Sequence, residues 1–397
     1  MLDNNKGVVM RKVMVLAVVS FVASWFLPGI DSALAKNPYR AVEMNDADGD
    51  GRMNFSEFGK PRKVFGKFDA DGDGFVTPEE VAKKWGVPLP PKPTGDAPKR
   101  TAAEAGTLDE SQTIIADVHM HPHPANHPVD VLTWMNRNGV KWAGLGSLGG
   151  GRKVREFYAK IMGNRYISFG GQDQLNRIYS EGGSEALEDS ENPKFKAMME
   201  MLKRDFEAGK LKGIGEIFAN SNTTSKFWMG RKMKIDAPTN RAIFDLATKF
   251  GGVLNMHMQW DSDSVEQLQA LAASNPSGKI IMAHCGSNTT ANNIREIMWK
   301  HQNIFCDLSA RHPPKLSPKL MEKKPEQVVF TESGLSDSWR ELIEEIPDRF
   351  MVGTDTESEG DYDGGIGTIR SGLLANLKPE TAEKVAYKNA QQLLRLQ

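Results

Sequence analysis

The chain has 397 residues, of which 39% are hydrophobic and 25% are charged, and its formal net charge is −1. A nearly neutral chain has no bulk electrostatic attraction to nucleic acid or to an anionic membrane surface, so neither is expected as a partner. Because a single hydrophobic core usually stops growing at roughly 250 to 300 residues, we expect two domains, or one barrel with a small additional module.

The first 35 residues have the pattern of an export signal. Basic residues precede an apolar run at 13–30, and Ala33-Leu34-Ala35 supplies the small residues that a signal peptidase recognises. The apolar run is also long enough to act as an uncleaved membrane anchor, but a Pro-Gly pair interrupts it, which favours cleavage. We therefore expect a periplasmic or secreted protein with no membrane attachment after cleavage.

Residues 36–86 contain an acidic pattern twice, at 46–57 and at 69–80. Each copy has oxygen donors at loop positions one, three, five, nine and twelve, and a glycine at position six (Gly51 and Gly74), where the chain must turn around an ion. The two segments resemble the loops of EF-hand proteins, which implies that they bind two calcium ions. The ligands that this resemblance implies are Asp46, Asp48, Asp50, Asn54 and Glu57 in the first loop, and Asp69, Asp71, Asp73, Thr77 and Glu80 in the second.

Only residues 58–68 separate the two loops, which is less than two independent flanking helices need. The apolar residues at the eighth loop position, Met53 and Val76, would let the loops pair back to back. A compact all-α module with structural calcium is therefore favoured over a sensor that opens on binding, and a regulatory role stays open. Residues 87–113 are rich in proline, alanine and charge, and we expect them to form a linker.

From residue 114 to the C-terminus, short apolar segments alternate with segments of helical periodicity. Eight strand-helix units in about 285 residues fit the usual size of a (β/α)₈ TIM barrel, and an open doubly wound sheet is the alternative. The expected strands end at His121, Leu148, Gln172, Phe218, Met258, Gly286, Ala310 and Asp355. The expected helices cover 129–138, 154–162, 195–208, 241–250, 264–273, 292–301, 339–345 and 382–396.

Polar residues at the ends of these strands are candidates for chemistry, because barrel active sites lie at the carboxyl ends of the strands. The first strand carries His119 and His121, and the alternation of side chains along a strand points both to one face. The fifth and sixth strands end in His257 and His284, and the eighth ends in Asp355. Each histidine alone is more often a satisfied core residue, but their recurrence at several strand ends indicates a metal site.

This order of residues resembles the amidohydrolase superfamily, in particular the amidohydrolase-related branch that includes the aminocarboxymuconate semialdehyde decarboxylase-like proteins. The resemblance extends from about residue 114 to the C-terminus, and it includes Gly353-Thr354-Asp355 and the Asn389-Ala390 pair. It implies a metal ion held by four strand-end residues, which are His119, His121, His257 and Asp355. It also implies that His284 binds a second ion or polarises the substrate.

The fourth strand decides between one metal ion and two. Two-metal members of the superfamily bridge the ions with a carboxylated lysine or a glutamate from this strand. Here Lys212 lies near the strand start and Glu216 at its end. Glu216 is therefore either the bridging ligand or a carboxylate that orients a ligand histidine. Imidazole and carboxylate ligands suit zinc best, with manganese or iron as alternatives.

The expected reaction is hydrolysis of an amide, lactone or ester bond of a small molecule by metal-bound hydroxide. Asp355 would carry the proton from the water to the leaving group, and His284 would stabilise negative charge on the substrate oxygen. Non-oxidative decarboxylation at the same site is the alternative that the family resemblance implies. A calcium-dependent binding protein with an inactive barrel is an alternative of another class, and the complete set of candidate ligands argues against it.

Further polar residues follow the strands in the expected loops. Arg152 follows a glycine run and could help to bind an anion, although a tight connection is favoured. Arg311 and His312 could meet a substrate carboxylate, but solvated loop positions are favoured for both. His123 and His127 are expected in the loop after the first strand, or beside the metal ligands.

The two cysteines of the chain, Cys285 and Cys306, fall on neighbouring expected strands. An exported protein could pair them. Because each lies in an apolar strand pattern and buried free cysteine is common, we expect no disulfide.

Overall fold

The computed structural model describes residues 37–46, 50–58, 62–91, 100–124, 126–147, 151–221, 231–313, 315–316, 318–356 and 358–397. The expected export signal, the calcium-loop residue Asp48 and part of the linker lie outside the described residues. None of the helices in the described part of the chain has the length and apolar character needed to span a lipid bilayer.

The N-terminal module is a small helical unit around a two-stranded antiparallel sheet. Its elements are α1 (Pro38–Asn45), β1 (Met53–Asn54), α2 (Phe55–Phe58), α3 (Arg62–Phe65), β2 (Phe75–Val76) and α4 (Pro78–Trp85). Met53 pairs with Val76, so the predicted back-to-back pairing of the two loops is confirmed. Both side chains are buried in a core that the module forms separately from the barrel.

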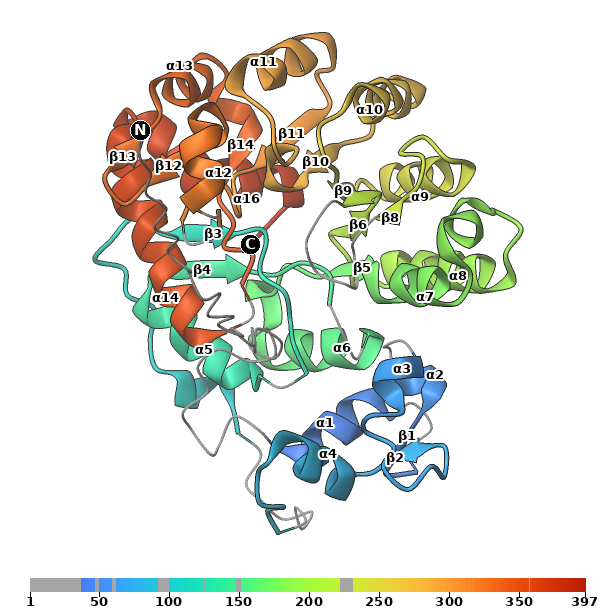
Figure 1. The fold of residues 1–397 in the computed structure, drawn as a ribbon. Helices are drawn as coiled ribbons and strands as arrows, with labels where there is room; N and C mark the ends of the chain where they lie inside the picture. Colours follow the sequence, from blue (N-terminus) through green and yellow to red (C-terminus); the bar gives the residue numbers. More distant parts are fainter. Residues whose placement is uncertain are drawn as a thin grey trace, which may run out of the picture.

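Eight parallel strands form the second domain. They are β3 (Ile115–Asp117), β4 (Val140–Ala143), β5 (Phe169–Gly171), β6 (Gly213–Phe218), β9 (Val253–His257), β10 (Ile280–Met282), β11 (Ile304–Asp307) and β14 (Phe350–Met351). One sheet has the order β5-β6-β9-β10-β11-β14, and β3 pairs with β4. In Figure 1 the strands occupy the centre of the domain and the helices lie around them.

Backbone contacts join the two groups of strands at both edges. The Ile167 N–H donates to the Ala143 carbonyl at 3.0 Å between β4 and β5, and the Val118 N–H donates to the Val352 carbonyl at 3.1 Å between β3 and β14. A parallel bridge between Met120 and Thr356 extends the second junction. The edges that an open sheet would leave unpaired are therefore joined, and the predicted (β/α)₈ class is confirmed.

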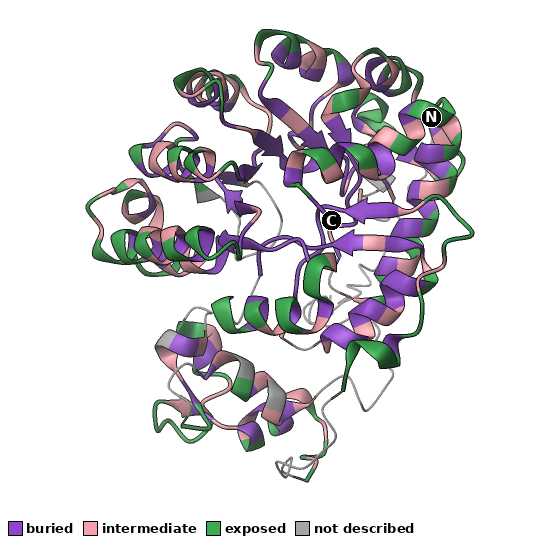
Figure 2. Ribbon diagram, turned by 180° about the vertical axis from the view of Figure 1, so that it is seen from behind, coloured by how far each residue is buried: buried purple, intermediate pink, exposed green. Residues whose placement is uncertain are grey.

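Amphipathic helices cover the outside of the barrel. The main ones are α5 (Pro128–Arg137), α6 (Gly151–Met162), α7 (Gln172–Glu188), α8 (Pro193–Glu207), α9 (Pro238–Lys249), α10 (Ser262–Ser274), α11 (Ala291–Lys300), α13 (Asp337–Glu345), α14 (Glu359–Thr368) and α16 (Asn389–Leu394). Figure 2 shows the strands buried and the outward helix faces exposed. Helix α7 was not predicted, because Gly182 and Gly183 interrupt its periodicity, and Gly183 kinks it with a φ of 67°.

Several strands are shorter than predicted, the first most clearly. The expected strand ran to His121, but β3 ends at Asp117. Beyond that point the chain leaves β4 and contacts the other neighbour, since the His119 carbonyl accepts from the Asp355 N–H at 2.7 Å. The two histidines consequently lie at the junction of the first and last strands.

The expectation of free cysteines was wrong, because Cys285 and Cys306 form a disulfide with Cα atoms 4.6 Å apart. Strand pairing explains the contact. Met282 of β10 lies opposite Cys306 of β11. A short 3₁₀ turn at Ala283–Cys285 then brings Cys285 back toward the same partner. A pattern of apolar strands alone did not reveal this turn.

Candidate metal centre and active site

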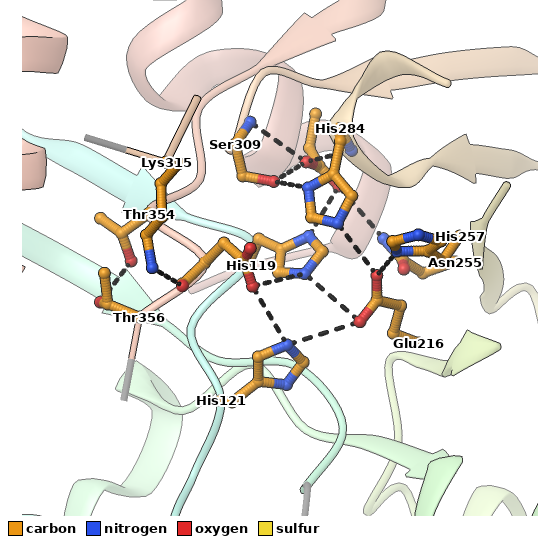
Figure 3. Close-up of polar contacts among 12 residues, drawn as sticks. His119, His121, Glu216, Asn255, His257, His284, Ser309, Lys315, Thr354 and Thr356 are labelled. Atoms are coloured by element: carbon orange, nitrogen blue, oxygen red, sulfur yellow. Dashed lines mark hydrogen bonds and ion pairs between the residues drawn. The ribbon is translucent and has the colours of Figure 1, made fainter. Parts of the chain in front are cut away.

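The candidate ligands come from separate strand ends and meet at the carboxyl end of the barrel. His119 and His121 follow β3, Glu216 lies in β6, His257 ends β9, His284 lies in the turn after β10, and Asp355 follows β14. All except Asp355 are buried, and the Asp355 side chain is 27% exposed. Figure 3 shows contacts from Glu216 to all four histidines. The structure therefore brings together every strand-end residue that was predicted as a ligand.

His119, His121 and Asp355 form the first group of donors, which Glu216 completes. The Nε2 atom of His119 lies 3.6 Å from Glu216 Oε2 and 3.7 Å from Asp355 Oδ1. The Nε2 atom of His121 lies 3.5 Å from Glu216 Oε2 and 3.6 Å from Asp355 Oδ1. A tetrahedral ion with bonds of about 2.0 to 2.2 Å separates its ligands by roughly 3.3 to 3.6 Å. The four imidazole-to-carboxylate distances, 3.5 to 3.7 Å, lie at the upper end of this range or just above it.

The second group lies across Glu216 and consists of His257 and His284. Glu216 Oε1 is 3.0 Å from His257 Nδ1 and 3.2 Å from His284 Nε2. These three residues form a separate potential ligand cluster from the one formed by His119, His121 and Asp355. The resemblance implies that His257 also binds the first ion, and in the structure its Nδ1 atom lies beside Glu216 Oε1 in the same cluster as His284. The two oxygens of Glu216 face different groups.

Hydrogen bonds fix the tautomer of His119 and His121. His119 Nδ1 lies 3.0 Å from Asp307 Oδ2, and His121 Nδ1 lies 2.9 Å from the Gly146 carbonyl. Both partners only accept, so each Nδ1 carries a proton, and in the neutral form that binds a metal each Nε2 presents a lone pair to the centre. The Nε2 atom of His119 has no hydrogen-bond partner within the described structure, although it is buried. A buried lone pair between two carboxylates is the environment that a cation satisfies.

The directions of the pKa shifts show that the cluster favours positive charge between its carboxylates. Burial alone would lower the pKa of His119, but the charges of Asp307 and Glu216 raise it well above its usual value. Burial opposes the ionised form of Glu216, yet His119, His121 and His257 hold the pKa of this carboxyl well below its usual range.

His121 and His257 both contact Glu216, but their pKa values shift in opposite directions. Burial works against the protonated form of His121, but hydrogen bonds to Asp355 and Glu216 raise its pKa to about 9. Burial lowers the pKa of His257 despite its contact with Glu216. Burial also opposes ionisation of Asp355, and the contact with His121 nevertheless keeps its pKa below the ordinary range.

Two buried carboxylates beside the ligands were missed in the sequence. Asp307 ends β11 and contacts His119, while Asp117 ends β3 and accepts from the Thr354 N–H at 3.0 Å and its hydroxyl at 2.7 Å. Both side chains are fully buried. An acidic residue within an apolar strand was the available signal, because a buried carboxylate needs partners.

The prediction that Arg311 and His312 are solvated was wrong. Arg311 is buried, and its guanidinium donates to the carbonyls of Gln327 and Thr289, the latter at 2.7 Å. It therefore links loops after the strands and does not reach toward a substrate carboxylate. His312 is also buried and stacks on Phe330, with ring centroids 4.6 Å apart.

The remaining predicted loop residues also have defined contacts. His127 caps α5, since its Nδ1 accepts from the Val129 N–H at 3.1 Å. The guanidinium of Arg152 lies 3.0 Å from Asp205, so it points toward α8. Lys212 donates to the Arg395 carbonyl at 3.0 Å, which agrees with its predicted position away from the metal ligands.

In each calcium loop, a predicted ligand carboxylate accepts a hydrogen bond from a backbone N–H group of the same loop. In the first loop, Asp46 accepts from the Gly51 N–H at 2.7 Å. In the second, Glu80 accepts from the Thr77 N–H at 2.9 Å as part of a capping box at the start of α4. The side chains of Asp69, Asp71 and Asp73 converge in the second loop, where a cation would have three carboxylates available.

Comparisons with known proteins agree with this architecture. The family model described as amidohydrolase matches residues 178–396, and the model described as EF hand matches residues 62–83. No significant match is found among curated protein sequences. The amidohydrolase match begins after the first-strand histidines, and the fold brings these histidines to the matched residues Glu216, His257, His284 and Asp355.

Solved structures with a similar arrangement are distant in sequence. An uncharacterised TIM-barrel protein from Bordetella bronchiseptica is 12% identical, with a TM-score of 0.47, over 71% of this chain and 99% of that one. An amidohydrolase from Burkholderia multivorans with bound zinc is 13% identical, with a TM-score of 0.41, over 72% and 100%. A 2,6-dihydroxybenzoate decarboxylase from Rhizobium is 12% identical, with a TM-score of 0.39, over 72% and 99%.

The amidohydrolase model covers more than half of the chain, and the site contains clusters of histidines and carboxylates that could hold a metal ion. The chain therefore belongs to the amidohydrolase family and is a metal-dependent enzyme of the amidohydrolase superfamily.

Proposed function

We propose that this protein hydrolyses an amide, lactone or ester bond of a small molecule, using two transition-metal ions. The observation that carries the proposal is the division of the donors into two groups that share Glu216. His119, His121 and Asp355 would hold one ion, His257 and His284 would hold the other, and the Glu216 carboxylate lies between the two groups and could serve both. The mixture of imidazole and carboxylate donors suits zinc best, with manganese or iron as alternatives.

When bound, the ions would supply Lewis acidity and lower the pKa of a coordinated water toward about 7. Asp355 would accept a proton from the attacking water and deliver it to the leaving group. Its position supports this role, because it is the one partly exposed member of the cluster. The Lys315 ammonium donates to the Asp355 carbonyl at 2.7 Å and places positive charge beside it (Figure 3).

His284 would act as a ligand rather than as a donor to the substrate. Its Nδ1 lies 2.9 Å from Ser309 Oγ, and the Ser309 hydroxyl donates to Asp307. The Ser309 oxygen can then only accept from His284, so the proton stays on Nδ1. The Nε2 lone pair faces Glu216, which leaves no proton there for a substrate oxyanion.

Elemental analysis and a substrate screen test this proposal together. Protein prepared without chelator should contain close to two transition-metal ions and turn over lactones, amides or esters. Asp355→Asn should reduce turnover by about 10²- to 10⁴-fold, the usual contribution of a proton-transferring group. The proposal is contradicted if the protein contains no metal as prepared and binds none after reconstitution. Release of carbon dioxide from aromatic carboxylates, without hydrolysis, would replace it with decarboxylation.

We further propose that the enzyme is exported and that its N-terminal module binds two calcium ions. The pattern at residues 1–35 supports export, and the disulfide between Cys285 and Cys306 is of a kind that persists in oxidising compartments. The paired loops and the EF-hand match at 62–83 support calcium binding. Sequencing of the mature N-terminus tests the first part, because cleavage should leave Lys36 as the first residue.

A further inference from the structure

Asp307 contacts both groups of the proposed centre. Its Oδ2 atom accepts from His119 Nδ1 at 3.0 Å and from Asn255 Nδ2 at 3.3 Å. Its Oδ1 atom accepts from the His284 N–H at 3.0 Å and from the Ser309 hydroxyl. The side chain is completely buried. Asp307 therefore forms a direct hydrogen bond to one candidate ligand of each group.

Ser309 extends this network from Asp307 to the imidazole of His284. The serine hydroxyl has one proton, which it donates to Asp307, so its oxygen accepts from His284 Nδ1 at 2.9 Å. The same carboxylate thus fixes the ring of His119 directly and the ring of His284 through one hydroxyl. Each ring is held with its Nε2 atom toward a different oxygen of Glu216.

The backbone at His284 also depends on this carboxylate. His284 has a φ of 55°, in the left-handed region that costs a non-glycine residue about 1 kcal/mol or more. Its N–H has Asp307 as an acceptor inside the barrel. Without that acceptor, a buried donor would lose its partner, and the turn that carries His284 would lose one of its anchors.

We propose that Asp307 is a positioning residue for both metal sites and that Ser309 transmits its effect to the second site only. This inference rests on the proposed two-metal function. It predicts an asymmetry that a general structural role would not produce. Loss of Ser309 should weaken only the ion bound by His284, while loss of Asp307 should weaken both ions.

Metal titration of protein freed of metal with a chelator tests the asymmetry. Cobalt(II) gives a visible absorption spectrum for each site, and zinc competition gives two dissociation constants. The His284→Ala variant identifies which constant belongs to the second site. Ser309→Ala should raise that constant by about 10- to 100-fold and leave the other within threefold, and Asp307→Asn should raise both by at least tenfold.

Ser168→Ala is a matched control, because Ser168 is also buried, near the other end of the barrel, and its hydroxyl has no partner within the described structure. It should leave both constants unchanged. Two results, obtained while the wild type binds two ions, would overturn the inference but not the proposed function. In the first, Ser309→Ala raises both dissociation constants equally. In the second, Asp307→Asn changes neither constant. A wild type that binds no ion overturns the proposed function and the inference with it.

Discussion

The Asp355 N–H donates to the His119 carbonyl at 2.7 Å, so one of the backbone hydrogen bonds at the junction of the last and first strands lies within the candidate site. The side chains of the same two residues face each other at 3.7 Å between His119 Nε2 and Asp355 Oδ1. The contact between these two residues therefore both closes the barrel and brings together two members of the first donor group. Changes that disturb this junction should affect metal binding and stability together.

Replacement of Glu216 by glutamine should reduce the metal content from two ions to at most one. The amide keeps the size of the side chain but removes the charge that both groups share. Elemental analysis of protein prepared without chelator measures the change. Lys212→Met, immediately before the strand of Glu216, is the control, because the Lys212 ammonium donates to the Arg395 carbonyl, away from the candidate ligands. Retention of two ions by Glu216→Gln would show that the carboxylate only orients the histidines.

Replacement of Gly353 by alanine should destabilise the barrel at its closing junction. A Cβ atom at this position would lie 2.6 Å from the Cβ of His119 and 3.1 Å from that of Ser309. Overpacking of this kind typically costs about 1 to 3 kcal/mol. Thermal denaturation should show a lower Tm and elemental analysis a lower metal content.

Gly364 provides the matched control for this substitution. It lies within α14, and nothing in the structure lies within 4 Å of an added Cβ there. Gly364→Ala should therefore stabilise the protein by about 0.5 to 1 kcal/mol through helix propensity. A Gly353→Ala variant as stable as Gly364→Ala would disprove the close packing against His119.

Loss of the disulfide should lower stability and loosen the second donor group. The bridge links residues 21 positions apart, and closure of a loop of that length is worth about 3 kcal/mol. Cys285 follows His284 and Cys306 precedes Asp307, so the bridge holds the backbone on both sides of their hydrogen bond. A Cys285→Ala/Cys306→Ala variant should melt several degrees lower than the oxidised wild type and bind the second ion more weakly.

A reductant separates the effect of the bridge from that of the substitutions. It should shift the Tm of the wild type toward that of the double variant and leave the double variant unchanged. An identical Tm for oxidised and reduced wild type would show that the disulfide does not stabilise the fold.

The double variant Glu57→Gln/Glu80→Gln should abolish the stabilisation by calcium while leaving turnover within about twofold. Both glutamates occupy the twelfth loop position, where a bidentate carboxylate is needed. Glu80 also accepts from the Thr77 N–H, so a small loss of stability should persist in chelator. Thermal melts with and without calcium separate the two effects.

Glu79→Gln on the exposed side of the same helix turn is the control and should respond to calcium like the wild type. A large loss of turnover with an unchanged Tm in the double variant would instead indicate that calcium regulates the enzyme.

The sequence was sufficient to predict the barrel and the strand-end residues, because both depend on local pattern. Alternation and periodicity identify strands and helices, and the topology then places strand ends together. The role of Asp307 could not be predicted, since it depends on a contact with His119 between strands far apart in sequence. The same limit applies to Cys285, whose direction is set by a turn with positive φ, and to Arg311, whose acceptors are backbone carbonyls of other loops.

The junction of the first and last strands also has a consequence for biosynthesis. The first donor group draws on residues from His119 to Asp355, so a growing chain lacks one of its ligands until the eighth strand has been made. Contacts of such sequence separation form late, because a long loop must close before they stabilise the fold. The enzyme should consequently acquire its full complement of metal only after synthesis is complete, and for an exported chain the metal would then come from the compartment in which folding ends.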